Sequence, residues 1–275
     1  MATFSIITVN YNNSKGLEAT ICSVLSQTCK DFEFIIIDGD STDGSKEVIK
    51  QYSDKIDYWV SEKDDGVYQA MNKGVLVAKG TYLNFMNSGD VFYDKNVLKK
   101  LLDMHFTEDI IVGKDIHYNS QGTSFSTIFP LQLGMYTFYK SYLPHQSTFF
   151  KRILFEKRLY DERLRIAADW KFYIECICED KSTVKMVNLI ICNREQDGIS
   201  SQQAQRSQDE RRKVLEEKIS PGVLSDYENL DQLDYHTTQK YLHIIKNKKG
   251  KKLMTLFIKI MYRLLGNKGM LTKDI

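Results

Sequence analysis

Along the first 115 residues, short apolar runs alternate with segments in which apolar residues recur every three or four positions. The runs have the length of buried strands, and the periodic segments between them have the spacing of amphipathic helices. Strands are predicted at 4–9, 32–37, 57–60, 82–86 and 110–114, and helices around 17–25, 46–52, 67–78 and 95–103. This alternation predicts an α/β fold with a mostly parallel, Rossmann-like sheet that carries helices on both faces.

The rest of the chain follows a different pattern. Residues 115–150 are polar and aromatic with weak periodicity, and loops and irregular strands are expected there. A helix at 169–178, a strand at 184–191 and solvent-facing helices at 202–219 and 228–246 follow. We therefore expect one domain over 1–200, with halves 1–115 and 116–200, and a helical appendage over 201–275.

Composition and cysteine usage narrow the class of protein. With 275 residues, 42% of them hydrophobic, the chain is long enough to bury a full core. Its five cysteines form no Cys-x-x-Cys pair, which argues against a zinc site and fits a reducing cytoplasm. The chain enters a strand pattern at once, so neither a signal peptide nor a membrane span is expected.

Charge is concentrated at the end of the chain. Residues 246–275 carry +8 and the remainder −6, within a total of +2. Over 246–268, lysines are followed by a broad apolar helical face, the pattern of a helix that lies on an anionic membrane surface. The alternative is a helix packed on the domain or on a partner subunit. The acidic remainder argues against nucleic acid as a partner.

Polar residues close the apolar strands of the first half. Asp38 ends the run Phe34–Ile37 and opens a segment of small residues in which the backbone can approach a nucleotide. Tyr11 follows the first strand on the same edge, where its ring can stack on a base or pack as a surface tyrosine. For Asp43 in the same segment, a helix cap is the favoured interpretation.

The stretch Ser61–Asp90 is the most specific part of the sequence. An acidic turn broken by Gly66 leads into a helical pattern, and a short aromatic strand then ends in Asn87-Ser88-Gly89-Asp90. This arrangement resembles the donor-binding core of the inverting family 2 glycosyltransferases, which have the GT-A fold and use nucleotide sugars. The resemblance covers residues 3 to about 115 well, and is looser to about 200.

The resemblance implies roles for several residues. Thr8, Tyr11 and Asp38 match positions that hold the nucleoside, although many relatives read Asp-Asp-Gly-Ser where this chain has Asp38-Gly39-Asp40-Ser41. Asp64 and Asn72 match positions that line the diphosphate and the donor sugar. For Asp64 the alternative is a favourable charge at the start of the next helix.

The resemblance also implies a divalent cation at Asp90. The family's usual Asp-x-Asp motif has Asn87 at its first position here, which leaves one carboxylate. One carboxylate, water and substrate phosphates suffice for Mg²⁺ or Mn²⁺, and the cation would offset the charge of the departing diphosphate. A plain β-turn is the alternative.

The remaining candidates lie in the second half. The resemblance assigns the catalytic base to Asp169, where Ala168 replaces a common Glu, although a helix cap is the simpler interpretation of an Asp at that place. Trp170 beside it suits stacking on an acceptor sugar, and His145 suits the acceptor side or the diphosphate. Residues 193–201 are predicted to form a polar loop, which is expected to be a donor-closing lid or an exposed loop.

These patterns predict an inverting glycosyltransferase that moves a sugar from a nucleoside-diphosphate sugar, with UDP favoured, to a glycan or lipid-linked glycan. It would work in the cytoplasm, peripherally on the membrane. The alternative is a nucleotide-binding module that retains the cleft but not the chemistry. The single carboxylate of the metal turn and the missing Glu before Asp169 keep that alternative open.

Overall fold

The computed structural model describes residues 2–118, 124–126, 129–130, 133–194, 203–246, 251–253 and 255–256. It divides into two compact units, Met1–Leu215 and Glu216–Ile275, which are described separately. The predicted boundary at residue 200 lies before the helix in which the first unit ends.

The first unit begins with four parallel strands. They are β1 (Phe4–Asn10), β2 (Phe32–Asp38), β3 (Tyr58–Ser61) and β4 (Tyr82–Phe85), in the order β3-β2-β1-β4. β1 is buried along its whole length, and so are the last five residues of β2. Their nearly continuous apolar runs follow from this, because helices cover both faces of a parallel sheet.

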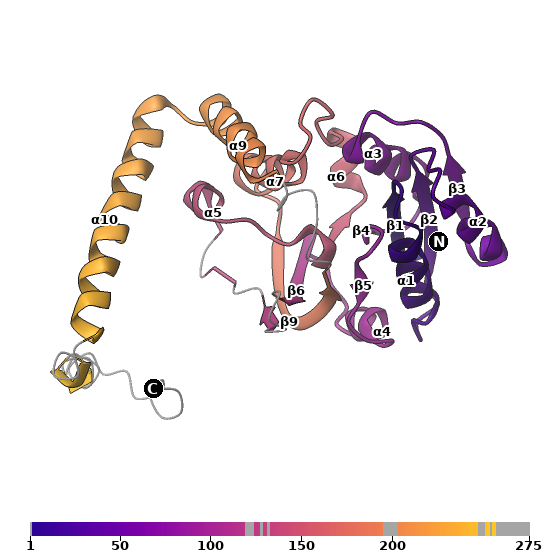
Figure 1. The fold of residues 1–275 in the computed structure, drawn as a ribbon, viewed down its shortest axis with the longest axis horizontal. Helices are drawn as coiled ribbons and strands as arrows, with labels where there is room; N and C mark the ends of the chain where they lie inside the picture. Colours follow the sequence, from indigo (N-terminus) through magenta and orange to yellow (C-terminus); the bar gives the residue numbers. More distant parts are fainter. Residues whose placement is uncertain are drawn as a thin grey trace. The chain divides into compact units, whose positions relative to one another are not determined.

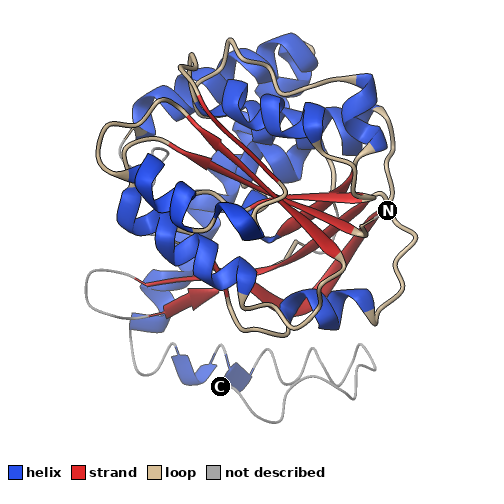
Figure 2. Cartoon of the chain, turned by 90° about the vertical axis from the view of Figure 1, so that its right-hand side faces the viewer, coloured by secondary structure: helices blue, strands red, loops and turns tan. Residues whose placement is uncertain are grey.

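Helices lie on both faces of this sheet (Figure 2). They are α1 (Ser14–Leu25), α2 (Ser45–Gln51), α3 (Val67–Val77) and α4 (Val97–Leu102). Gly74 lets α3 approach β1, because a Cβ there would lie 2.5 Å from a methyl carbon of Ile7. These elements lie at the predicted positions within one or two residues, and at α1 within three.

The second half of the sheet is mixed. β8 (Thr148–Lys151) runs antiparallel to β4 and to β6 (Ile110–Tyr118), and β6 runs parallel to β9 (Val184–Asn193). Two short strands, β5 (Val91–Phe92) and β7 (Ser124–Ser126), pair antiparallel with β9 and β6. The expected parallel order therefore describes the first four strands, β1 to β4, which are labelled side by side in Figure 1. Beyond them β8 reverses the direction.

Short helices cover the second half. They are α5 (Met135–Lys140), α6 (Ile153–Lys157) and α7 (Ala168–Tyr173), which continues as a π-helical segment, Ile174–Glu179. Aromatic rings fill the space between β8, α6 and α7: the Phe155 and Phe172 rings stack with centroids 4.4 Å apart. The aromatic residues of this half therefore serve largely as core.

Two longer helices follow, α9 (Ala204–Lys218) and α10 (Pro221–Lys246). Both are expected to face solvent; α9 exposes most of its residues but buries one face, with Ser207, Glu210, Val214 and Leu215. Most of the basic tail predicted at 246–268, and most of the 193–201 loop, lie outside the described residues. Among the residues that are described, no helix is long and apolar enough to cross a membrane.

Candidate active site

Asp38 ties three strand ends together. One of its oxygens accepts from Asn10 Nδ2 at 2.7 Å and from Ser41 Oγ at 2.6 Å. The other accepts from the Ser41 backbone N–H at 3.0 Å and from Ser61 Oγ at 2.5 Å. A carboxylate offers about four acceptor positions, and all four are occupied here. Asp38 is fully buried, so it shapes the edge of the sheet, and a direct bond to a nucleoside would have to displace one of these donors.

Tyr11, Gly39 and Asp64 lie together at this edge, where Tyr11 is exposed, Asp64 is partly buried and Gly39 is buried. The Tyr11 ring is 69% exposed. A Cβ on Gly39 would lie 2.7 Å from Asp64 Oδ2 and 3.2 Å from a carbon of the Tyr11 ring, so both side chains border the same glycine. Burial, with a smaller contribution from Asp38, raises the pKa of Asp64. An exposed ring beside a carboxylate oxygen suits a flat base that carries an N–H donor.

Gly39→Ala is expected to weaken nucleotide binding about tenfold while the fold is retained, because the new methyl group displaces the Asp64 carboxylate. A tenfold loss corresponds to about 1.4 kcal/mol. Titration of UDP by calorimetry measures it, with Gly222→Ala as the control, since a Cβ there meets no atom within 4 Å. Unchanged affinity in Gly39→Ala would remove this edge from the nucleotide site.

Two other predicted contacts are used inside the protein. Thr8 is fully buried, and its hydroxyl donates to the Met86 carbonyl at 2.7 Å. Asn72 is also buried; its amide donates to the Tyr160 carbonyl and accepts from the Tyr160 N–H, both at 2.9 Å. These side chains join β1 to β4 and α3 to the segment before α7. We therefore assign them structural roles in place of the predicted ligand contacts.

The turn predicted to hold a metal is tightly built. Asp90 N–H donates to the Asn87 carbonyl at 2.9 Å, and Gly89 has φ of 101°, which makes this a turn with glycine at its third position. The Thr20 hydroxyl from α1 donates to the Asp90 carbonyl at 2.8 Å and accepts from Gly89 N–H at 3.0 Å. Asp90 is thus fixed at the carboxyl edge of the sheet, 5% exposed.

A divalent cation fits this turn only if phosphate oxygens of a bound substrate and water complete its coordination. Within the described residues, no group of three or more His, Cys, Asp or Glu is placed to hold a metal ion. A site with a single carboxylate suits Mg²⁺ or Mn²⁺, because these ions fill the rest of their coordination shell with phosphate oxygens and water. Arg194 lies close enough for its charge to interact with Asp90 and Asp115.

Asp169 lies in the first turn of α7, and its side chain is 18% exposed. The Tyr68 hydroxyl is 2.7 Å from one carboxylate oxygen, and His145 Nδ1 is 3.0 Å from the other. Burial raises the pKa of Asp169, but hydrogen bonds from His145, Tyr68 and the Trp170 N–H outweigh it, so the pKa falls below its usual value. Asp169 is therefore ionised at neutral pH, as a general base must be.

His145 joins the candidate base to the candidate metal turn. It begins a short 3₁₀ segment, His145–Ser147, and its Nε2 lies 3.4 Å from Asn87 Nδ2. If the Asn87 amide donates to Nε2, the proton of the neutral imidazole is on Nδ1 and points at Asp169. The network assigns this tautomer. His145 thus lies between the candidate base and the metal turn, and Asn87 orients its ring.

Trp170 is buried at 2% exposure and does not offer a ring to an acceptor sugar. Its indole N–H donates to the Phe138 and Ser141 carbonyls, both at 3.1 Å, and the Arg211 guanidinium lies 5.4 Å from its ring centroid. Its predicted place on the acceptor side is therefore corrected to a structural role, in which it fixes α5 against α7.

Tyr68→Phe is expected to raise the pKa of Asp169, because the ionised carboxylate loses a donor. A hydrogen bond to a charged group is worth about 1.5–3 kcal/mol, and this hydroxyl is shared with the Ile166 carbonyl at 2.6 Å. The acidic limb of kcat/KM should therefore move up by about one pH unit. The pH–rate profile measures it.

Tyr160→Phe is the matched control for that substitution. The Tyr160 ring lies 5.6 Å from the Tyr68 ring, and its buried hydroxyl has no hydrogen-bond partner among the described residues. Its removal should leave the acidic limb in place. Equal displacement of the limb in both variants would contradict the role given to the Tyr68 hydroxyl.

Several residues of the site were not singled out from the sequence. Tyr68 and Arg165 are two of them: a Cβ on Gly66 would lie 2.6 Å from an Arg165 guanidinium nitrogen, so this cation lies over the turn that carries Asp64. Glu210 from α9 holds the turn before Asp169. Of these residues, only Tyr68 had a local signal in the sequence, because it begins a segment with helical periodicity.

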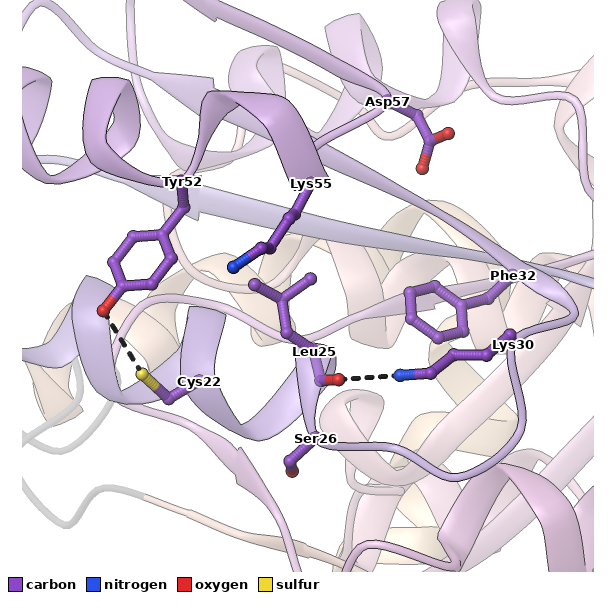
Figure 3. A pocket seen from close by; sticks show the side chains of 8 residues that line it. All are labelled: Cys22, Leu25, Ser26, Lys30, Phe32, Tyr52, Lys55 and Asp57. Carbon is purple, nitrogen blue, oxygen red and sulfur yellow. Dashed lines mark hydrogen bonds between the residues drawn. The ribbon is translucent and has the colours of Figure 1, made fainter.

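A separate open pocket of about 670 Å³ lies at the opposite edge of the sheet (Figure 3). It is bordered by Phe32 at the start of β2 and by Asp57, which precedes β3. There the Cys22 sulfur is 3.7 Å from the Tyr52 hydroxyl, and Lys30 donates to the Leu25 carbonyl at 2.8 Å. Because ligands of parallel α/β sheets bind at the carboxyl ends of strands, this pocket is not the candidate active site.

The fold is shared with solved structures that hold nucleotide sugars. It resembles Staphylococcus aureus TarS residues 1–349 in complex with UDP-GlcNAc, with TM-score 0.58 and 18% identity, covering 74% of this chain and 61% of that one. It also resembles the mannosyltransferase PcManGT of Pyrobaculum calidifontis in complex with GDP-Man and Mn²⁺, with TM-score 0.56, 14% identity, and 75% and 61% coverage. This chain spans about three fifths of either structure. The fold of this chain is therefore of the GT-A type.

Sequence relatives identify the family. The profile of glycosyl transferase family 2 matches residues 5–159, so the chain belongs to this family and is a glycosyltransferase. A PGL/p-HBAD biosynthesis glycosyltransferase of Mycobacterium bovis is 30% identical over 197 residues, which cover 69% of this chain and 75% of that protein. An uncharacterized glycosyltransferase of Methanocaldococcus jannaschii is 29% identical over 188 residues, covering 64% and 65%.

Proposed function

We propose that this glycosyltransferase acts by inversion, moving a sugar from a nucleoside-diphosphate sugar, UDP-linked in the first instance, to a hydroxyl of a glycan or lipid-linked glycan. The observation that carries the proposal is the Asp169 carboxylate, ionised and held between Tyr68 and His145. In a single displacement, one base takes the proton of the acceptor hydroxyl as that oxygen attacks the anomeric carbon.

Asp169 suits this task by its geometry. Its two oxygens are oriented by different partners, the Tyr68 hydroxyl and His145 Nδ1, so the carboxylate cannot rotate freely. A fixed base near a bound hydroxyl lowers the entropic part of the barrier. The lowered pKa keeps the base ionised, and attack at the anomeric carbon supplies the driving force for proton transfer because the acceptor hydroxyl becomes acidic as its bond forms.

Asp90 is the residue proposed to hold a divalent ion. Bound there, Mg²⁺ or Mn²⁺ would neutralise negative charge on the departing nucleoside diphosphate. Arg165, over the Gly66 turn, and Arg194, near Asp90, are the cations of this chain proposed to share that charge. Tyr11 and Asp64 are proposed to bind the base, with Asp38 holding the strand ends beneath them.

The proposal of a lipid-linked acceptor is based on the basic tail, residues 246–268. Residues 246–268 pair lysines with an apolar face, a composition that favours an anionic lipid surface. A transferase at the inner face of a membrane would meet lipid-linked glycans there. The mycobacterial relative is named for PGL/p-HBAD biosynthesis, and the solved relatives bind UDP-GlcNAc or GDP-Man.

The second candidate function is a nucleotide-binding module without chemistry. The observation that favours it is the use of Asn87, at the first position of the metal motif, as a partner of His145. A protein that had lost its reaction would still bind the nucleotide through the Tyr11 edge.

The test of the function is donor turnover by the full chain. Each of UDP-glucose, UDP-galactose, UDP-GlcNAc and GDP-mannose is incubated with Mn²⁺ or Mg²⁺ and with a polyprenyl-linked glycan, and release of the nucleoside diphosphate is measured. Turnover of one donor, with the product linkage inverted by NMR, supports the transferase. Nucleotide binding without release from any donor favours the module.

A further inference from the structure

The turn that leads into the candidate base has an unusual partner. The backbone N–H groups of Arg165, Ile166 and Ala167 all donate to Glu210 of α9, at 3.0, 2.8 and 3.1 Å. Three successive N–H groups that converge on one carboxylate form an anion nest. Here the anion is a side chain of the same protein that lies 44 residues further along in sequence from Ile166.

This carboxylate takes the place of a local cap. The N-cap residue, which precedes α7, is Ala167; it has no side-chain acceptor, and no side-chain cap is formed there. Glu210 is 8% exposed, and burying a charge of this kind is unfavourable unless donors surround it. The three N–H groups and Arg206 Nε at 3.2 Å supply those donors.

Ile166 is held on both sides. Its N–H donates to Glu210, and its carbonyl accepts from the Tyr68 hydroxyl at 2.6 Å. The same hydroxyl lies 2.7 Å from Asp169. A shift of the turn therefore changes the distance between Asp169 and Tyr68 directly.

The next residue of α9 holds the other side of the same helix. The Arg211 guanidinium lies 5.4 Å from the Trp170 ring centroid and 5.5 Å from that of Tyr142. Glu210 and Arg211 thus fix the residues before and after Asp169. Both belong to the compact unit Met1–Leu215 and lie beyond residues 5–159, where the family profile matches.

We propose that Glu210 is a positioning residue for the base: α9 holds the 165–167 turn and, through it, sets Asp169 against Tyr68 and His145. The inference rests on the proposed role of Asp169. If Glu210 has this role, the catalytic unit includes α9, and this helix helps to hold the active site in place.

The test uses the full chain with Glu210→Gln and Glu210→Ala, and Asp209→Asn as the matched control. Asp209 is the exposed neighbour on α9 and accepts only from Gln205 Nε2 among the hydrogen bonds of the described residues. We expect kcat of Glu210→Ala to fall about 30- to 100-fold, because a misplacement of about 1 Å can cost 10²-fold. Glu210→Gln should fall less, since its amide oxygen still accepts. The donor KM and the UDP-induced thermal shift should stay within twofold of wild type.

Amide hydrogen exchange provides a readout that does not depend on turnover. Exchange should accelerate at residues 165–173 in both Glu210 variants, and not in Asp209→Asn. Unchanged exchange there, or kcat of Glu210→Ala within threefold of the control, would overturn the proposal. Loss of the UDP-induced shift in both variants would also overturn it, because Glu210 would then support the whole fold. Faster local exchange in a chain whose wild type turns over no donor would support the positioning and refute the transferase.

Discussion

Asp169→Asn is expected to lower kcat by about 10³-fold, within the range measured for loss of a general base. Asparagine has nearly the same shape and still accepts from the Tyr68 hydroxyl, but it cannot take the proton of the acceptor. The effect should therefore fall on kcat and leave the affinity for UDP unchanged. Steady-state kinetics with the accepted donor, together with calorimetric titration of UDP, separate the two quantities.

Asp180→Asn is the control for this substitution. Asp180 follows the π-helical end of the same segment, where it pairs with Arg158 at 2.7 Å. Its loss should change stability little, since a partly exposed ion pair contributes little, and it should leave kcat within about threefold. A fall in kcat of less than tenfold in Asp169→Asn would give the role of base to another group.

Asp90→Ala is expected to abolish the part of UDP binding that depends on the metal. With UDP and Mn²⁺ at about 100 times Kd, wild type should gain about 2.7 kcal/mol, or roughly 5–10 °C in Tm for a chain of this size. The variant should show the small shift that wild type shows in EDTA. Thermal denaturation with UDP, with and without Mn²⁺, measures both states, and donor turnover should be lost in parallel.

Asp94→Ala is the control for the metal turn. Asp94 lies four residues further along, is partly exposed and pairs with Lys100 at 2.7 Å. Its removal should leave the Mn²⁺-dependent shift intact. If Asp90→Ala kept that shift, the cation would be bound elsewhere and the assignment of Asp90 would be wrong. If wild type bound UDP equally well in EDTA, the metal-independent module would be favoured.

The elements of the first half could be predicted from the sequence because their signals are local. Apolar runs and helical periodicity depend on neighbouring residues, and the predicted bounds agree with β1, β2, α3 and β4 within one or two residues. The antiparallel β8 was not predictable in this way. Its direction follows from pairing with β4, 60 or more residues away in sequence, and from a preceding stretch without clear periodicity.

Prediction of the candidate site from the sequence has the same limit. Asp169 and His145 were singled out by the resemblance to the family, and the structure brings their side chains within 3.0 Å. Asn72 and Thr8 match family positions equally well, yet both are used inside the protein. Asn72 bonds to the Tyr160 backbone and to Glu162, and Thr8 bonds to the Met86 carbonyl. A match to a family position alone does not distinguish a residue that binds a ligand from one that stabilises the fold.

Glu210 could not be identified from the sequence for a different reason. It lies in a strongly polar helix, where one glutamate among many charged residues looks like part of a solvated face. Only the spatial convergence of three N–H groups singles it out.

The distance in sequence between Glu210 and the turn that it holds also sets an order of events during synthesis. The strands of the proposed nucleotide edge leave the ribosome first, but domains generally fold as units. The carboxylate that fixes Ile166 is made 44 residues later. Under the proposed positioning, the nascent chain becomes competent for transfer only when α9 has emerged and docked.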